Sequence, residues 1–123
     1  NIVSTKDHAD AALLVETHRA AAFAMDDILL FGLKANAKDP ASPEVVGDPL
    51  QVEPYACMIR KNDPKFKALV DAVITGMMKS GEFEKLYNKG FIQPIPPRNQ
   101  SIGLPMSKEL QDNIKAPSDK PAT

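Results

Sequence analysis

Hydrophobic residues recur at helical spacing in five stretches of the chain. The clearest stretch follows Asp63, which suits an N-cap, and Pro64, whose missing N–H costs nothing at the first helical position. Gly81 ends this helix. Its apolar stripe comprises Phe66, Leu69, Val70, Val73, Ile74, Met77 and Met78. Further helices are predicted over residues 7–17, 28–37, 82–89 and 107–114.

Short apolar runs outside these helices predict strands, of which the run at residues 20–25 is expected to be buried. They cover residues 2–3, 20–25, 45–46 and 55–60. The order strand, helix, strand, helix in the first 40 residues is typical of an α/β fold with a parallel sheet. All 11 prolines lie at or after Pro40, which indicates a subdomain boundary there. Residues 92–105 are expected to form an extended connector, and the tail 116–123 is expected to fray.

Composition narrows the class of protein more than it identifies a function. A chain of 123 residues with 43% hydrophobic and 25% charged residues fits one globular domain, and a net charge of −1 gives no footprint for nucleic acid. No apolar run approaches the roughly 20 residues that span a bilayer. Cys57 is the only cysteine, so no internal disulfide or thiolate metal cage is expected. The chain begins at Asn1 and not at Met, which we interpret as a processed or truncated amino terminus.

Motifs that carry enzyme or cofactor chemistry are not evident. The chain has no phosphate-binding loop, no GxGxxG sequence and no nucleophile elbow. Its two histidines, His8 and His18, lie outside any zinc-ligand spacing. We therefore predict a non-enzymatic protein with no catalytic residues, no metal and no cofactor.

Two polar stretches lie where a predicted strand ends and a helix begins: TKDHAD at residues 5–10 and AMDD at residues 24–27. Ligands of open α/β sheets bind at such ends. Taken alone, each stretch is more often only a capped helix start on the surface. One N-cap carboxylate is enough for a helix, however. We therefore assign the cap to Asp27 and regard Asp26 as a spare carboxylate at the strand end.

Several stretches in the same order resemble the family 3 periplasmic solute-binding proteins of polar amino-acid ABC importers. Within that family the chain most resembles the glutamate/aspartate-binding proteins. The resemblance covers most of the chain and rests on KDHAD (6–10), RAAAFAMDDILL (19–30), EPYACMIRKNDPKFKALVD (53–71), SGEFEKLYNK (80–89) and PIPPRN (94–99).

The resemblance implies an α/β fold that is the second-half segment of a two-lobe type II periplasmic-binding-protein fold. It places residues 1–50 in ligand-binding lobe 2. Residues 51–61 become a strand that crosses the hinge, and residues 62–123 become helices that return to lobe 1. It further implies a periplasmic protein that delivers an acidic amino acid, L-glutamate or L-aspartate, to an ABC permease in the inner membrane.

The resemblance also assigns ligand-binding roles to two residues. Asp26 matches the carboxylate that receives the ligand's α-ammonium, and His8 matches a position that faces the acidic side chain. The groups that clamp the α-carboxylate in the family match nothing in this chain. His18 departs from the family because a small residue commonly precedes Arg19, and this departure leaves the turn after the first helix open.

Two other interpretations remain open at the level of sequence. In the first, Asp26 and His8 form a general acid/base pair of a dehydratase-like enzyme on the same scaffold. In the second, the chain is a truncated segment without binding activity of its own. Its unpaired strand edges then favour association between copies.

Overall fold

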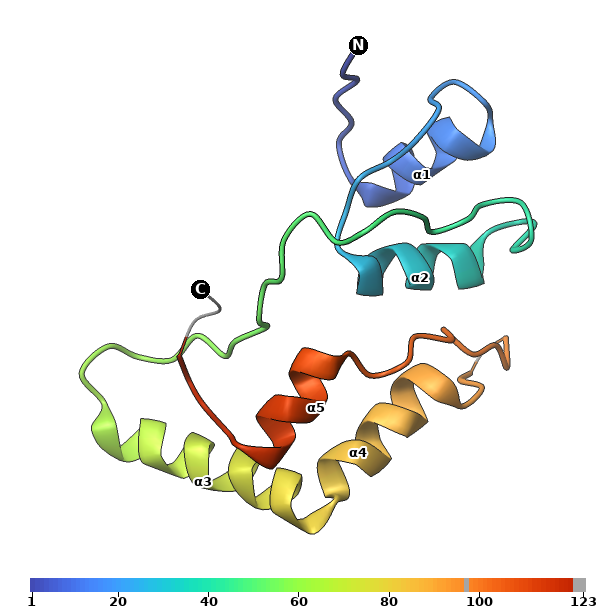
Figure 1. Ribbon diagram of the computed structural model, residues 1–123. Helices are drawn as coiled ribbons and strands as arrows, with labels where there is room; N and C mark the ends of the chain where they lie inside the picture. The colour runs from blue at the N-terminus through green and yellow to red at the C-terminus, as the bar shows by residue number, and fades with distance from the viewer. Residues whose placement is uncertain (97, 121–123) are drawn as a thin grey trace. The chain divides into compact units, whose positions relative to one another are not determined.

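The computed structural model describes residues 1–96 and 98–120, and regular structure in this part is helical (Figure 1). Pro97, within the PIPPRN stretch, and residues 121–123 of the tail lie outside it. The helices are α1 (His8–Glu16), α2 (Asp27–Asn36), α3 (Pro64–Ser80), α4 (Glu82–Tyr87), the π-helical turn η1 (Asn88–Ile92) and α5 (Lys108–Lys115). The five predicted helices are confirmed. Their bounds shift by about one residue, and Gly90 does not end the fourth helical segment because η1 continues to Ile92.

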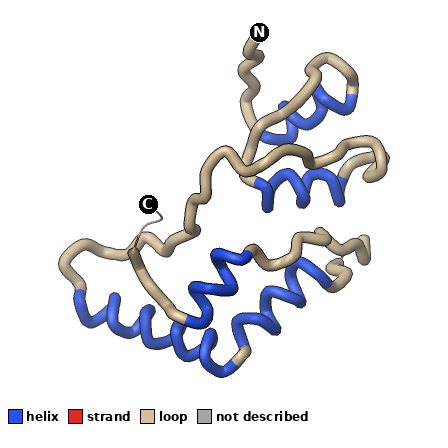
Figure 2. The backbone as a smooth tube through the Cα atoms, viewed as in Figure 1, coloured by secondary structure: helices blue, strands red, loops and turns tan. Residues whose placement is uncertain are grey.

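The predicted strands are wrong. Within the described residues, the only β pairing is an isolated antiparallel bridge between Ile95 and Gln100 (Figure 2). The runs expected as strands are coil whose side chains are largely exposed, and Ile2 and Met58 are each 99% exposed. A strand is stable only when a neighbouring strand pairs its backbone N–H and C=O groups. These runs have strand-like sequences without a ladder to join.

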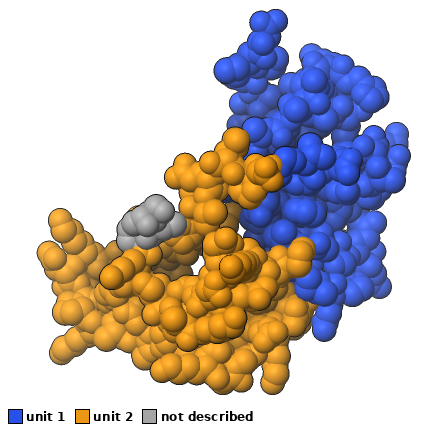
Figure 3. Space-filling model, in the orientation of Figure 1, with its two compact units in different colours: residues 1–47, 91–104 blue, residues 48–90, 105–123 orange. Residues whose placement is uncertain are grey.

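The described chain divides into two compact units (Figure 3). Unit 1 comprises residues 1–47 and 91–104, and it contains α1 and α2. Its two chain segments are joined by a hydrogen bond of 2.9 Å from Arg98 Nη1 to the carbonyl of Asn36. The adjacent Ala37 is buried. The assignment of residues 1–50, 51–61 and 62–123 to lobes and hinge stays a prediction.

Unit 2 comprises residues 48–90 and 105–123, within which α3 packs against both α4 and α5. The Asp63 carboxylate caps α3 by accepting a hydrogen bond of 3.0 Å from the Phe66 N–H. Gly81 separates α3 from α4 with a left-handed φ of 76°. Met78 is the buried hydrophobic side chain of this unit. Asp63 and Gly81 therefore begin and end α3 as the sequence predicts.

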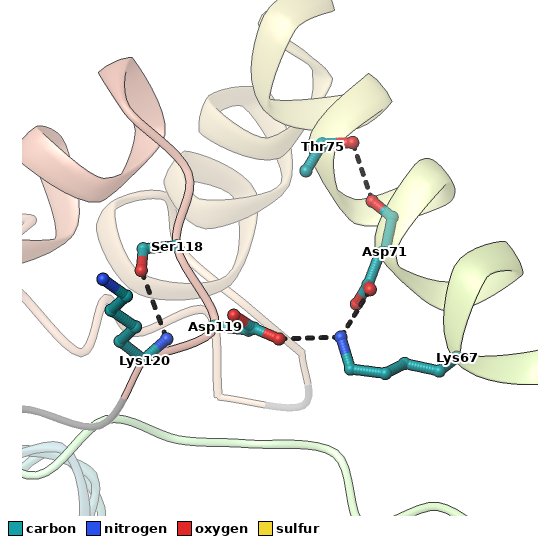
Figure 4. A network of polar contacts seen from close by, with 6 residues as sticks. All are labelled: Lys67, Asp71, Thr75, Ser118, Asp119 and Lys120. Carbon is teal, nitrogen blue, oxygen red and sulfur yellow. Dashed lines mark hydrogen bonds and ion pairs between the residues drawn. The ribbon is translucent and has the colours of Figure 1, made fainter. Parts of the chain in front are cut away.

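The segment after α5 is held onto α3 by charged side chains (Figure 4). Lys67 Nζ lies 2.6 Å from the Asp71 carboxylate and 2.7 Å from the Asp119 carboxylate, and all three side chains are exposed. Hydrogen bonding to Asp119, and then to Asp71, raises the pKa of Lys67, while Lys67 lowers the pKa of Asp119. The backbone N–H of Ser118 also donates a hydrogen bond of 2.9 Å to Asn113 Oδ1. The expectation of a frayed tail is therefore wrong for residues 118–120.

Candidate ligand-binding site

The start of α1 presents His8 to solvent on a capped helix. Asp7, in an extended conformation, is the N-cap, and its Oδ1 accepts a hydrogen bond of 2.9 Å from the Asp10 N–H. The hydroxyl of Thr5 donates to the Asp7 carbonyl at 3.1 Å. His8 is the first helical residue and is exposed. Because Asp7 supplies the cap, the imidazole of His8 is not needed to begin the helix.

At the start of α2, the neighbouring aspartates Asp26 and Asp27 accept different hydrogen bonds. Asp26 occupies the N-cap position, and its carbonyl accepts hydrogen bonds from the N–H groups of Leu29 and Leu30 at 3.1 and 3.0 Å. The side chain of Asp26, however, makes no capping hydrogen bond. The Asp27 carboxylate instead accepts a hydrogen bond of 2.7 Å from the Ile28 N–H. The helix begins one residue earlier than predicted, with Asp27 bonding the first turn through its side chain.

An aromatic contact joins the start of α1 to the segment that leads into α2. The rings of His8 and Phe23 have centroids 6.4 Å apart and planes inclined at 31°. Phe23 is half-buried and precedes Asp26 by three residues. The helix starts that carry His8 and Asp26 therefore lie at the same end of unit 1 (Figure 1). Sequence reasoning did not single out Phe23, because it lies within an apolar run whose simplest interpretation is a core strand.

Two open hollows lie elsewhere in unit 1. One, of about 300 Å³, lies between α1 and α2 and is lined by residues that include Leu13, Leu33 and Ala37. The other, of about 370 Å³, is lined by residues that include His18 and Arg19. Neither hollow is lined by His8 or Asp26. These two side chains are exposed and present an imidazole and a carboxylate on the surface of unit 1.

His18 closes α1 in the left-handed conformation that glycine usually adopts. Its φ is 56°, and its N–H donates a hydrogen bond of 3.0 Å to the Val15 carbonyl. The Arg19 N–H donates to the Leu14 carbonyl at 2.8 Å. This pair of bonds is the Schellman motif, which satisfies the last carbonyl groups of a helix. The departure at His18 therefore preserves a glycine-type helix end, although the residue carries a side chain.

No group of three or more histidine, cysteine, aspartate or glutamate side chains in residues 1–96 and 98–120 is arranged to hold a metal ion. In the same part of the chain, no helix is long and apolar enough to cross a membrane.

Cys57 is exposed and unbridged. The run around it, residues 55–60, was predicted to be a strand but is coil.

Comparison with known proteins shows that the chain is similar, over nearly its whole length, to solute-binding proteins for acidic amino acids. No protein-family model matches it. It is 48% identical over 122 residues to the L-glutamate/L-aspartate-binding protein of Pseudomonas aeruginosa. It is 49% and 47% identical over 119 residues to the glutamate/aspartate import solute-binding proteins of Salmonella typhimurium and Escherichia coli. The resemblance predicted from the sequence motifs is thereby confirmed.

The match covers most of this chain but less than half of each relative. It includes 97–99% of the chain and 39–40% of the relatives, so the chain spans about two fifths of the length of the curated relatives that it matches. The relatives are named for binding and import, not for catalysis. They therefore support the non-enzymatic prediction over the dehydratase-like alternative.

Proposed function

We propose that this chain forms part of the solute-binding component of an ABC importer. It binds L-glutamate or L-aspartate in the periplasm and delivers the amino acid to a permease in the inner membrane. The observation that carries the proposal is the identity of 47–49%, over nearly the whole chain, to three proteins named for glutamate and aspartate.

The proposed architecture is the second-half segment of a two-lobe type II fold. Residues 1–50 belong to lobe 2, residues 51–61 cross the hinge, and residues 62–123 return to lobe 1. The coil found at residues 20–25 and 55–60 is compatible with this proposal, because a strand sequence needs a neighbouring strand before it forms a ladder. The relatives have additional sequence from which such neighbours can come, since the match covers only 39–40% of their length.

Asp26 receives the α-ammonium group of the ligand in this proposal. Its support is that Asp26 matches the ligand-anchoring carboxylate of the family that the chain resembles, and that its side chain is exposed at the start of α2. A hydrogen bond between charged groups contributes about 1.5–3 kcal/mol. A positively charged ammonium is therefore a suitable partner for a carboxylate in this position.

His8 contacts the acidic side chain of the ligand in the same proposal. Its support is that α1 is already capped by Asp7, so that the exposed imidazole can donate a hydrogen bond to a ligand carboxylate. The Phe23 ring lies beside the imidazole, with the two ring centroids 6.4 Å apart. His8 and Asp26 then recognise opposite charges on one zwitterionic ligand.

Calorimetry on a full-length chimera tests the proposed function. In the chimera this chain replaces the matched region of the Pseudomonas aeruginosa relative, and glutamate, aspartate, glutamine and arginine are titrated in turn. We expect saturable binding of glutamate and aspartate, and at least tenfold weaker binding of glutamine and arginine. Equal affinity for all four amino acids, or binding of none of them by a cooperatively melting chimera, would contradict the proposal.

A further inference from the structure

The side chain of His8 is not held in place by the helix that carries it. Side chains of an α-helix lean toward its N-terminus, over the preceding turn, and that turn excludes one of the three χ1 rotamers. His8 is the first residue of α1, so no helical turn precedes it. The neighbouring Asp7 directs its own carboxylate at the Asp10 N–H and leaves the imidazole out of the cap. The local structure therefore allows the exposed ring several orientations.

Phe23 is the group placed to restrict this ring. The centroids of the two rings are 6.4 Å apart and their planes are inclined at 31°. Interacting aromatic rings have centroids roughly 4.5–7 Å apart, and such a pair changes an equilibrium by a factor of about two to ten. Among residues 1–96 and 98–120, the His8 imidazole has no hydrogen bond or ion pair. Phe23 is half-buried and His8 is exposed, so the phenyl ring is the better fixed member of the pair.

Phe23 also belongs to the segment that carries the second proposed ligand contact. Residues 22–26 are one short stretch of coil that leads into α2, with Asp26 at the N-cap position. In an acidic amino acid, covalent bonds limit the distance between the ammonium and the side-chain carboxylate. The groups that recognise both ends must therefore keep a matching separation, which requires neighbours that restrict their rotamers. A contact between Phe23 and His8 links the imidazole to the segment that ends in Asp26.

We propose that Phe23 is a positioning residue, which orients the His8 imidazole toward the side chain of the ligand and thereby sets the preference for a carboxylate over an amide. This inference rests on the proposed function, because it assigns Phe23 a role at the same site. Phe23 acts through His8, since an imidazole with fewer orientations loses less side-chain entropy on binding. A carboxylate accepts a stronger hydrogen bond than an amide oxygen does, so glutamate gains more than glutamine from a well-placed imidazole.

NMR spectroscopy of the chain tests the contact without a ligand. The phenyl ring of Phe23 shifts the resonances of nearby imidazole protons. Phe23→Leu removes the ring and keeps an apolar side chain, so the carbon-bound imidazole protons of His8 should move toward the positions seen in an unstructured peptide. Phe31→Leu is the matched control, because Phe31 is also half-buried in unit 1 but lies on α2. Unchanged His8 resonances in Phe23→Leu would overturn the inference.

Calorimetry on the chimera tests the effect on selectivity. We expect Phe23→Leu to weaken glutamate binding by about threefold to tenfold and glutamine binding by less than twofold. Phe23→Tyr keeps the ring and should restore the preference for glutamate. In a His8→Ala background, Phe23→Leu should not change the ratio of the two affinities further, because no imidazole is left to position.

A purely structural role of Phe23 predicts a different result. Equal losses for glutamate and glutamine in Phe23→Leu, or a further change of the ratio in the His8→Ala background, would overturn the inference. A chimera that binds glutamate and keeps its full preference in Phe23→Leu would overturn the inference alone. Failure of the unsubstituted chimera to bind glutamate would instead contradict the proposed function, so the two failures are distinguishable.

Discussion

The Lys67 ammonium and the Asp119 carboxylate lie 2.7 Å apart, although 52 positions separate them in the sequence. Asp71, one helical turn after Lys67, shares the same ammonium at 2.6 Å. The segment after α5 is thereby fastened to the first turns of α3. Because the three side chains are exposed, this contact fixes a chain segment more than it contributes to global stability.

Breaking the contact is expected to release residues 118–120 without unfolding unit 2. Asp119→Asn removes the charge that holds Lys67, so the backbone amides of these residues should exchange with solvent several-fold faster. Lys115→Gln is the matched control, because it breaks another exposed pair, with Asp112 at 3.7 Å, that does not hold the tail. Hydrogen exchange measured by NMR reports both effects. Equal exchange in the two variants would show that the Asp119 contact does not fasten the tail.

The same contact gives an expected pH dependence. The pKa of Asp119 is lowered in the folded chain, so its contribution is present above the ordinary aspartate range and is lost as the pH falls through the lowered pKa. The pKa of Lys67 is raised, so its contribution is complete below the ordinary value of 10.5 and is lost as the pH rises through the raised pKa. Protection of residues 118–120 should therefore be constant at neutral pH and fall at both extremes.

His18→Gly is expected to stabilise the end of α1. The φ of 56° costs a residue with a Cβ atom about 1–2 kcal/mol, and glycine does not have this cost. Part of the gain is lost because glycine has more freedom in the unfolded chain, so we expect about 1 kcal/mol. His18→Ala is the control, since alanine keeps the Cβ atom and should give no gain. Urea denaturation followed by circular dichroism measures both, and an equal effect of the two substitutions would contradict the explanation.

Gly76 inside α3 and Gly81 directly after it are expected to respond to alanine in opposite directions. Gly81 has a φ of 76°, so Gly81→Ala should destabilise unit 2 by about 1 kcal/mol, although no atom lies within 4 Å of the added Cβ. Gly76 lies inside the helix with equally open surroundings, so Gly76→Ala should stabilise it by about 0.5–1 kcal/mol. Thermal melts of the two variants separate backbone conformation from steric space. A stabilising Gly81→Ala would contradict the left-handed end of α3.

Asp26 and Asp27 are expected to differ in ligand binding although they are neighbours. In the chimera, Asp26→Ala should weaken glutamate binding by about 2–5 kcal/mol, because the ammonium loses its charged partner. Asp27→Ala should leave the affinity within about threefold and instead destabilise α2 by a few tenths of a kcal/mol to about 1 kcal/mol. Calorimetry and thermal melts distinguish the two effects. Undiminished glutamate binding by Asp26→Ala would remove the role proposed for Asp26.

His8 is expected to determine selectivity for an acidic side chain. His8→Ala in the chimera should weaken glutamate binding by about 1.5–3 kcal/mol, the value of one hydrogen bond to a charged group, with a smaller effect on glutamine. His8→Gln keeps a donor and should recover part of the affinity. Equal losses for glutamate and glutamine would show that His8 does not contact the ligand's acidic group.

The helices could be predicted because their signals are local. Asp63 and Ser107 accept hydrogen bonds from N–H groups three residues later, and such caps are read directly from neighbouring residues. The strand predictions failed, because an apolar run such as residues 20–25 becomes a strand only when another segment pairs with it. Single-sequence patterns do not contain that information.

The candidate site was predicted in part. Asp26 and His8 were singled out from the helix starts, and the structure brings those starts to the same end of unit 1 through the contact of His8 with Phe23. That contact joins residues on different elements, so periodicity does not reveal it. Likewise, η1 continues through Gly90 although glycine usually ends a helix.

The discontinuous composition of unit 1 has a consequence for limited proteolysis. The chain passes between the two units at residues 47/48, 90/91 and 104/105. A protease that cuts once within the coil of residues 51–60 leaves both later crossings intact, yet it severs residues 1–47 from unit 2. Noncovalent contacts such as the hydrogen bond from Arg98 to Asn36 then retain the nicked piece. The cut chain should migrate as two bands under denaturing conditions and as one species in native gel filtration.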